Sequence, residues 1–336
     1  MSTLEQLSAP FATNPDLIQG SGGNTSVKIS ETEMQIKASG FRLSDIDNSN
    51  GFVTVNYDNI AEYFTASKYT ETDDPEKHLK AFVADNIIGD RLKLPSMETG
   101  FHAVLDKYVV HTHSVYSNII NCTAGSEFLL QSIFPKDTPA FIHYCNPGFY
   151  LSKSIANLMA SGTNRPKVIF LENHGLITHS NDAQEAVDLN SKVNKAIQNY
   201  YSIAIEYPES NLELQVEGLY KSNTLLLKDW MRSCGSIQAA MSLTLFPDQA
   251  VFFNGQIDFT GSNNTNFKIS IHPETFEINY RTNEKEAKAI DETITAFYFI
   301  LYHLKQLKLT PKYVSQANVA YITGMDMEKY RKNLMK

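Results

Sequence analysis

Up to residue 205, short apolar runs alternate with stretches in which apolar residues recur at helical spacing. The short runs predict strands at 28–29 and 34–36, which flank a polar turn as in a hairpin, and at 51–55, 108–113 and 167–172. The helical stretches predict helices over Met97–Tyr108 and Asp182–Tyr201. This alternation is typical of an α/β domain.

The pattern lapses at Tyr207–Leu214, where the sequence YPESNLEL shows no clear period. We therefore predict one domain over residues 1–205 and a smaller α+β domain over 206–336, with a structural or oligomerisation role. Within the second domain, the pattern predicts a helix over 225–245, strands at 250–254 and 267–280, a long amphipathic helix over 284–308 and a short helix within 315–336.

The chain has 29 basic and 37 acidic residues, which give a net charge of −8, and its basic residues form no cluster. Proteins that bind nucleic acid or anionic membranes non-specifically need a cationic face, so neither partner is expected. Three widely spaced cysteines, no signal peptide at the start and no apolar stretch long enough to span a bilayer favour a cytoplasmic protein.

Two histidines, His111 and His113, end the predicted strand KYVVHTH. Side chains at positions i and i+2 of a strand point to the same face, so both imidazoles can reach one metal ion. On this observation alone, two such side chains more often face solvent or form hydrogen bonds than bind a metal.

A third histidine, His174, follows the apolar strand KVIFLE, and Gly175 would allow a sharp turn there. Glu98 precedes His111 by about a dozen residues, in the first turn of the predicted helix. Three histidines with a nearby glutamate are the composition of a catalytic zinc site. The alternatives are a structural histidine and a glutamate that offsets the helix dipole.

Small and hydroxyl-bearing residues are concentrated in GSGGNTS, at 20–26, and in KASG, at 37–40. Their backbone N–H groups could form a concave anion site without a large basic patch. The same composition is also found in ordinary flexible turns.

Six motifs in this order resemble the class II aldolase/adducin family, which includes fuculose-phosphate and rhamnulose-phosphate aldolases and ribulose-phosphate 4-epimerases. The motifs are GGNTSVK (22–28), IKASGF (36–41), PSMET (95–99), HTH (111–113), PGF (147–149) and ENHGL (172–176). The resemblance covers about residues 1–205. It implies a three-layer α/β/α domain with a central, mostly antiparallel sheet.

The resemblance also implies a role for individual residues. It makes His111, His113 and His174 ligands of Zn²⁺ or another divalent transition metal, and Glu98 the catalytic acid/base. It places a phosphate pocket at Gly23, Asn24, Ser39, Gly40 and Ser96. Met97 stands where family aldolases commonly have a second serine, so the bound anion could instead be a carboxylate.

The implied function is a zinc-dependent aldolase, a lyase that cleaves or forms a C–C bond in a ketose phosphate or related sugar acid through a metal-bound enediolate. Epimerases, dehydratases and decarboxylases of the family use the same residues, and adducin-like members are non-enzymatic interaction modules. We expect a small-molecule sugar or sugar-phosphate substrate and a homo-oligomer, such as a tetramer. Residues 206–336 lack a glycine-rich dinucleotide loop, so no NAD site is predicted.

Overall fold

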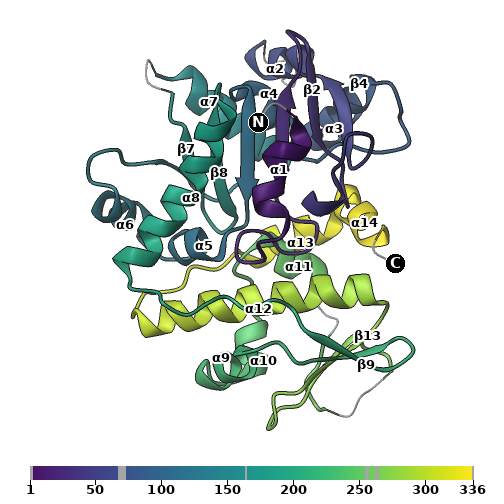
Figure 1. Ribbon diagram of the computed structural model, residues 1–336, viewed down its shortest axis with the longest axis vertical. Coiled ribbons are helices and arrows are strands. Elements are labelled where there is room, and N and C mark those ends of the chain that lie inside the picture. Colours follow the sequence, from purple (N-terminus) through teal and green to yellow (C-terminus); the bar gives the residue numbers. More distant parts are fainter. Residues whose placement is uncertain (1–2, 67–72, 163–164, 254–256, 262–264, 335–336) are drawn as a thin grey trace.

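One eight-stranded sheet forms the centre of the N-terminal part of the protein (Figure 1). The computed structural model describes residues 3–66, 73–162, 165–253, 257–261 and 265–334. The strands of this sheet are β1 (Asn24–Lys28), β2 (Glu33–Lys37), β3 (Phe52–Asn56), β4 (Ile87–Ile88), β5 (Tyr108–Thr112), β6 (Ala140–Ile142), β7 (Val168–Leu171) and β8 (Gly175–Ser180).

The order across this sheet is β4-β3-β2-β1-β5-β8-β7-β6. Every neighbouring pair is antiparallel except β6 and β7, which run parallel. The structure thus confirms the mostly antiparallel central sheet, the β1–β2 hairpin and the predicted strands at 51–55, 108–113 and 167–172.

Helices cover both faces of this sheet. Val110 of β5 packs in a cluster with α1 (Leu4–Ala12) and α8 (Ala183–Tyr200). The adjacent Val109 points the other way, into a cluster with α4 (Thr99–Val104) and α7 (Phe149–Ala160). The predicted three-layer α/β/α arrangement is therefore confirmed. The remaining helices of this part are η1 (Leu43–Asp45), α2 (Tyr57–Thr65), α3 (Pro75–Asp85), α5 (Val115–Asn121) and α6 (Ser126–Ile133).

A second, five-stranded sheet with its own helices follows, as expected for an α+β region. Its strand order is β11-β12-β13-β10-β9. These strands are β9 (Leu212–Val216), β10 (Leu219–Ser222), β11 (Ile257–Asp258), β12 (Ile269–Ile271) and β13 (Ile278–Arg281), and the helices are α9 (Leu227–Ser233), α10 (Ile237–Met241), α11 (Pro247–Phe253), α12 (Glu284–Gln306), α13 (Gln316–Gly324) and α14 (Asp326–Asn333).

The two regions share one hydrophobic core. Tyr116 of α5 and Trp230 of α9 both make edge contacts with Phe299 of α12, at ring-centroid distances of 5.7 and 5.4 Å. In Figure 1, α11, α13 and α14 lie between α12 and the first sheet. The division at residue 205 stays a prediction, but the second region clearly packs against the first. In the described ranges, no helix is both long and apolar enough to cross a membrane.

The helix predicted over Met97–Tyr108 is shorter in the structure. It spans only Thr99–Val104, because Leu105 is extended and the amino group of Lys28 binds the carbonyl oxygens of Ala103 and Leu105. The side chain of Lys28 thus satisfies carbonyl groups that another helical turn would have used.

Four predictions in the second region are wrong in detail. Residues 250–253 of the strand predicted at 250–254 belong to helix α11, because a short apolar run does not distinguish a strand from a buried helix, and residue 254 lies outside the described residues. The helix predicted over 225–245 is divided into α9 and α10 at Gly235, which has a φ of +89°. The C-terminal segment forms two helices, α13 and α14, and the predicted strand at 267–280 is the antiparallel pair β12 and β13.

Candidate metal centre

Motifs that are distant in the sequence pair at one end of the first sheet. The N–H of Ser39 donates to the carbonyl of Leu94 at 2.8 Å, and that of Ser96 donates to the carbonyl of Lys37 at 3.1 Å. The register of β1 against β5 places Asn24 opposite His111. IKASGF, PSMET, GGNTSVK and HTH therefore meet in one place.

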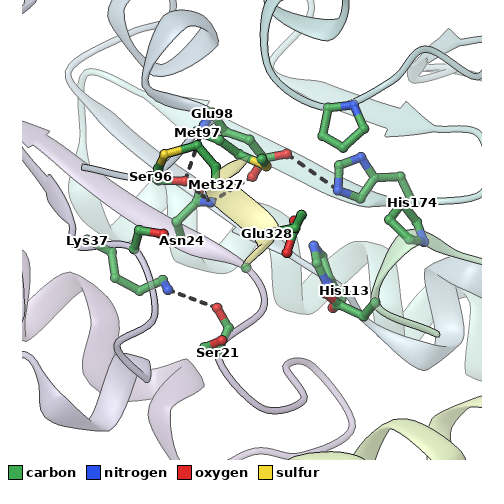
Figure 2. A pocket seen from close by; sticks show the side chains of 15 residues that line it. Ser21, Asn24, Lys37, Ser96, Met97, Glu98, His113, His174, Met327 and Glu328 are labelled. Carbon is green, nitrogen blue, oxygen red and sulfur yellow. Dashed lines mark hydrogen bonds and ion pairs between the residues drawn. The ribbon is translucent and has the colours of Figure 1, made fainter. Parts of the chain in front are cut away.

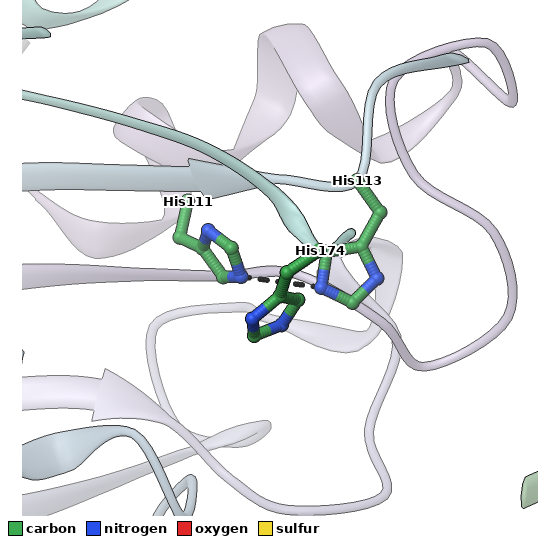
Figure 3. A group of neighbouring side chains, drawn as sticks. All are labelled: His111, His113 and His174. Carbon is green, nitrogen blue, oxygen red and sulfur yellow. Dashed lines mark hydrogen bonds between the residues drawn. The ribbon is translucent and has the colours of Figure 1, made fainter. Parts of the chain in front are cut away.

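The structure brings His111, His113 and His174 together, all of them buried (Figure 3). One ring nitrogen of each lies within 4.8 Å of the other two. His111 belongs to β5, His113 follows the end of that strand, and His174 lies in the turn between β7 and β8.

The turn that carries His174 depends on its two neighbours. Asn173 has a φ of +52°, and its side-chain amide donates to the carbonyls of Leu245 and Lys312 at 2.8 and 2.7 Å. A Cβ on Gly175 would lie only 2.4 Å from the carbonyl oxygen of Thr112 and 2.9 Å from the ring of His111. Any larger residue would push β8 away from the histidines of β5.

The hydrogen bonds of two histidines define which nitrogens carry protons. Nδ1 of His111 lies 3.1 Å from the carbonyl of Leu176, and Nδ1 of His113 lies 2.6 Å from Oδ2 of Asp248. Since both partners accept, both Nδ1 atoms donate. The Nε2 lone pairs of the two rings then face each other across 3.1 Å.

This donor set fits a divalent transition metal. Two nitrogens that each lie 2.0–2.1 Å from a tetrahedral ion are about 3.3 Å apart, close to the observed separation. Two facing lone pairs without a cation between them would repel each other. His111, His113 and His174 can therefore hold a metal ion.

His111 and His174 are also in the protonation state that a metal needs. Burial lowers the pKa of His111 to about 4 and that of His174 to about 3, although the Glu98 carboxylate partly opposes the effect. Both rings are therefore neutral near pH 7, and neutral imidazole is the ligand form.

Glu98 faces the histidine cluster from just before α4, as its N-cap residue and not in the first turn (Figure 2). Its carboxylate oxygens lie 3.5 Å from Nε2 of His111 and 3.4 Å from Nε2 of His174. Burial raises the pKa of Glu98, but attraction to the imidazoles and a hydrogen bond from Asn24 outweigh burial and lower the pKa to about 2. The group is thus a carboxylate near neutral pH.

A buried hydrogen-bond chain holds Glu98. The amide of Asn24 donates to Oε2 of Glu98 at 2.7 Å and to Oγ of Ser96 at 3.0 Å. Its carbonyl oxygen is bonded to Nε2 of His102, whose Nδ1 accepts from Oγ of Ser26 at 2.7 Å. Burial lowers the pKa of His102 to about 3, so the ring is neutral and orients Asn24.

A cavity beside the histidines contains most of the residues predicted for anion binding (Figure 2). Gly23, Asn24, Ser39 and Ser96 line it, whereas Gly40 is not among its described lining residues. Gly40 instead packs against Leu334: a Cβ there would lie 2.5 Å from Cδ1 of that leucine. The further lining residues are Ser21, Lys37, Met97, Glu98, His113, Pro147, His174, Pro247, Asp248, Met327 and Glu328.

Four residues that shape this cavity were not predicted from the sequence. Lys37, in the KASG motif, is buried and donates to the carbonyls of Ser21 and Phe41 at 2.9 and 2.7 Å. Asp248, Met327 and Glu328 come from α11 and α14, outside the six motifs. The motif could have indicated Lys37, but no local signal in the sequence indicates the other three.

Comparison with known proteins agrees with this geometry. The family described as Class II Aldolase and Adducin N-terminal domain matches residues 6–201, so the chain belongs to the class II aldolase and adducin family. The resemblance predicted from the six motifs is thereby confirmed. No curated protein matches the chain in sequence.

The similarity of the chain to solved structures ranges from moderate to low. The N-terminal class II aldolase domain of a conserved protein from Thermoplasma acidophilum is 27% identical over 59% of this chain and 91% of that chain, with a TM-score of 0.51. L-fuculose-1-phosphate aldolase from Thermus thermophilus is 13% identical over 59% of this chain and 95% of its own, with a TM-score of 0.38. A sugar-phosphate aldolase from Thermotoga maritima is 14% identical over 60% and 95%, with a TM-score of 0.39.

Proposed function

We propose that this protein is a divalent-metal-dependent lyase of the class II aldolase type. It cleaves or forms a C–C bond in a ketose phosphate or a related sugar acid, and Zn²⁺ is the expected metal. The observation that carries the proposal is the buried cluster of His111, His113 and His174 with the Glu98 carboxylate facing it. Family membership supports an enzyme with this chemistry.

The three histidines would hold the ion, and when bound it supplies a Lewis acid that stabilises negative charge on substrate oxygens. Glu98 gives a proton to, or takes one from, the carbon at which the C–C bond breaks or forms. Asn24 fixes the carboxylate by its 2.7 Å hydrogen bond to Oε2. Because Glu98 and Asn24 are buried, little reorganisation is needed during proton transfer.

The far side of the cavity supplies the anion site. Lys37 contributes a buried positive charge, and Ser39 and Ser96 contribute polar groups beside it. A buried cation binds an anion more strongly than an exposed one does, because the local dielectric constant is lower. This arrangement supports a substrate with a phosphate or carboxylate group at one end.

Epimerisation, dehydration and decarboxylation by family members would use the same acid/base and metal ligands. The products distinguish them: a lyase yields an aldehyde and a shorter ketone, an epimerase yields an isomer without fragments, and a decarboxylase yields CO₂. An adducin-like module without enzymatic activity would not need a buried set of ligand nitrogens facing a carboxylate.

The first test is the metal content of the purified protein beside the His111→Ala/His113→Ala variant. We expect about one transition ion per chain in the wild type and a large loss in the variant. The loaded protein is then incubated with ketose phosphates, sugar acids and β-keto acids, and the products are identified by NMR. No metal in the wild type, even after reloading with Zn²⁺, would reject the proposal. Metal binding with only isomers or CO₂ as products would replace the lyase with the corresponding alternative.

A further inference from the structure

Asp248 lies outside the part of the chain that the family match covers, yet it contacts the candidate metal centre. Its Oδ2 accepts the Nδ1 proton of His113 at 2.6 Å, and the aspartate side chain is only 4% exposed. A carboxylate that accepts the second N–H of a ligand imidazole fixes the orientation of the ring and makes the other nitrogen a stronger donor.

The absence of a side chain at Gly22 is a second observation that supports the contact between Asp248 and His113. A Cβ on Gly22 would lie 2.7 Å from Oδ2 of Asp248 and also 2.7 Å from Nδ1 of His113. Carbon atoms do not approach polar atoms so closely, so any side chain here would separate the pair. Gly22 begins the GGNTSVK motif, and its role at this position is to let the aspartate reach the histidine.

The helix that carries Asp248 is held firmly. The side chain of Gln249 accepts from the N–H of Leu245 at 2.8 Å and donates to the carbonyl of Leu243 at 2.6 Å. The carbonyl of Leu245 in turn accepts from Asn173, which precedes His174. One segment, residues 243–249, therefore contacts the supports of two of the three histidines.

We infer that Asp248 is a positioning residue for the metal centre and that the C-terminal region completes this centre through α11. The inference rests on the proposed function, because it needs His113 to be a metal ligand. It assigns residues 206–336 a part in metal binding beyond the structural or oligomerisation role expected from the sequence.

The test is the affinity for Co²⁺ and Zn²⁺, measured by competition with a chromophoric chelator, and the visible absorption of the Co²⁺ form. Asp248→Asn keeps the shape but removes the charge, and we expect its affinity to fall about 10- to 100-fold. The matched control is Asp106→Asn, because Oδ2 of Asp106 lies 2.9 Å from Nδ1 of His179 in a partly buried pair just before the start of β5. This control should bind metal as the wild type does.

A second variant tests the same contact without altering either partner. Gly22→Ala should weaken metal binding and change the Co²⁺ spectrum, because its methyl group separates Asp248 from His113. Gly324→Ala is the control, since a Cβ there would meet no atom within 4 Å. Gly22→Ala decides the question if Asp248→Asn does not fold.

The outcomes separate this inference from the proposed function. A wild type that binds no metal rejects the proposed function and the inference with it. A wild type that binds metal, with Asp248→Asn and Gly22→Ala both within twofold of it, rejects the inference alone. An equal loss in Asp106→Asn also rejects it, because the effect would then not be specific to the metal centre.

Discussion

Glu76 is a partly buried carboxyl group that should make the stability of this protein depend on pH. Its Oε2 accepts the N–H of Phe149 at 2.7 Å, at the start of α7. Gly148, with a φ of +92°, turns the chain so that this N–H faces Glu76, and Pro147 just before it lines the candidate site. The contact therefore anchors one wall of the cavity.

Burial raises the pKa of Glu76 from 4.5 to about 7, although the hydrogen bond from Phe149 partly opposes the shift. In the unfolded chain the group loses its proton near its ordinary pKa, whereas the folded protein keeps it to higher pH. Folding therefore takes up a proton between about pH 4.5 and 7, and stability must fall as the pH rises through this range. A shift of about 2.5 pH units at about 1.4 kcal/mol per unit corresponds to about 3.5 kcal/mol, of which about 3 kcal/mol is lost between pH 4.5 and 7.5.

Glu76→Gln removes this dependence, because the amide has nearly the same shape, can still accept from Phe149 and does not ionise. The assay is reversible urea unfolding of both proteins from pH 4.5 to 8, with equal m values required. The stability of the variant relative to the wild type should rise by about 3 kcal/mol between pH 4.5 and 7.5. Glu274→Gln, at an exposed position, serves as the control. The reasoning would be refuted if the difference in unfolding free energy between variant and wild type changed by less than about 0.5 kcal/mol from pH 4.5 to 8, well below the change calculated from proton linkage.

Three further predictions concern the site itself. Glu98→Gln should retain the metal but lose about 10²- to 10⁴-fold in turnover, because the amide cannot transfer a proton. Metal analysis and kcat measure the two effects. A near wild-type rate would contradict the role assigned to Glu98. Gly175→Ala should lower the free energy of unfolding by about 1–3 kcal/mol and weaken metal binding, because its Cβ would lie 2.4 Å from the carbonyl oxygen of Thr112. Thermal unfolding and metal titration measure the two effects. If neither changes, β8 accommodates the methyl group. Glu328→Gln should tighten the binding of inorganic phosphate on the order of tenfold, because it removes a negative charge from the cavity that Lys37 lines. Calorimetry measures this affinity. Weaker or unchanged phosphate binding would show that the carboxylate does not face the anion.

The residues that the sequence could reveal lie close to one another along the chain or belong to a recognisable motif. His111 and His113 lie on the same face of a strand because their positions differ by two, and this holds for any arrangement of the other elements. His174 lies between Asn173 and Gly175, and Glu98 follows two residues after Ser96, whose hydroxyl accepts the N–H of Glu98. The resemblance, and not the periodicity, predicted the mostly antiparallel central sheet. Periodicity identifies single strands but does not show which strands pair.

The residues that the sequence did not reveal reach the site through packing between distant segments. Asp248 contacts His113, and Glu328 lines the cavity, only because α11 and α14 pack over the end of the first sheet. A single aspartate or glutamate on a helix is usually solvated, so nothing in its neighbourhood distinguishes one that is buried.

The misassigned strand at 250–254 and the unpredicted role of Asp248 have the same physical origin. Helix α11 buries its apolar residues Ala250 and Val251, but it also buries Asp248 and Gln249, so it has no outward polar face to produce a helical period. A buried polar side chain must have a partner, and here the partners are His113 and the backbone around Leu245. The sequence pattern does not predict α11 correctly because polar contacts position this helix, and one of these contacts, from Asp248 to His113, connects it to the candidate metal centre.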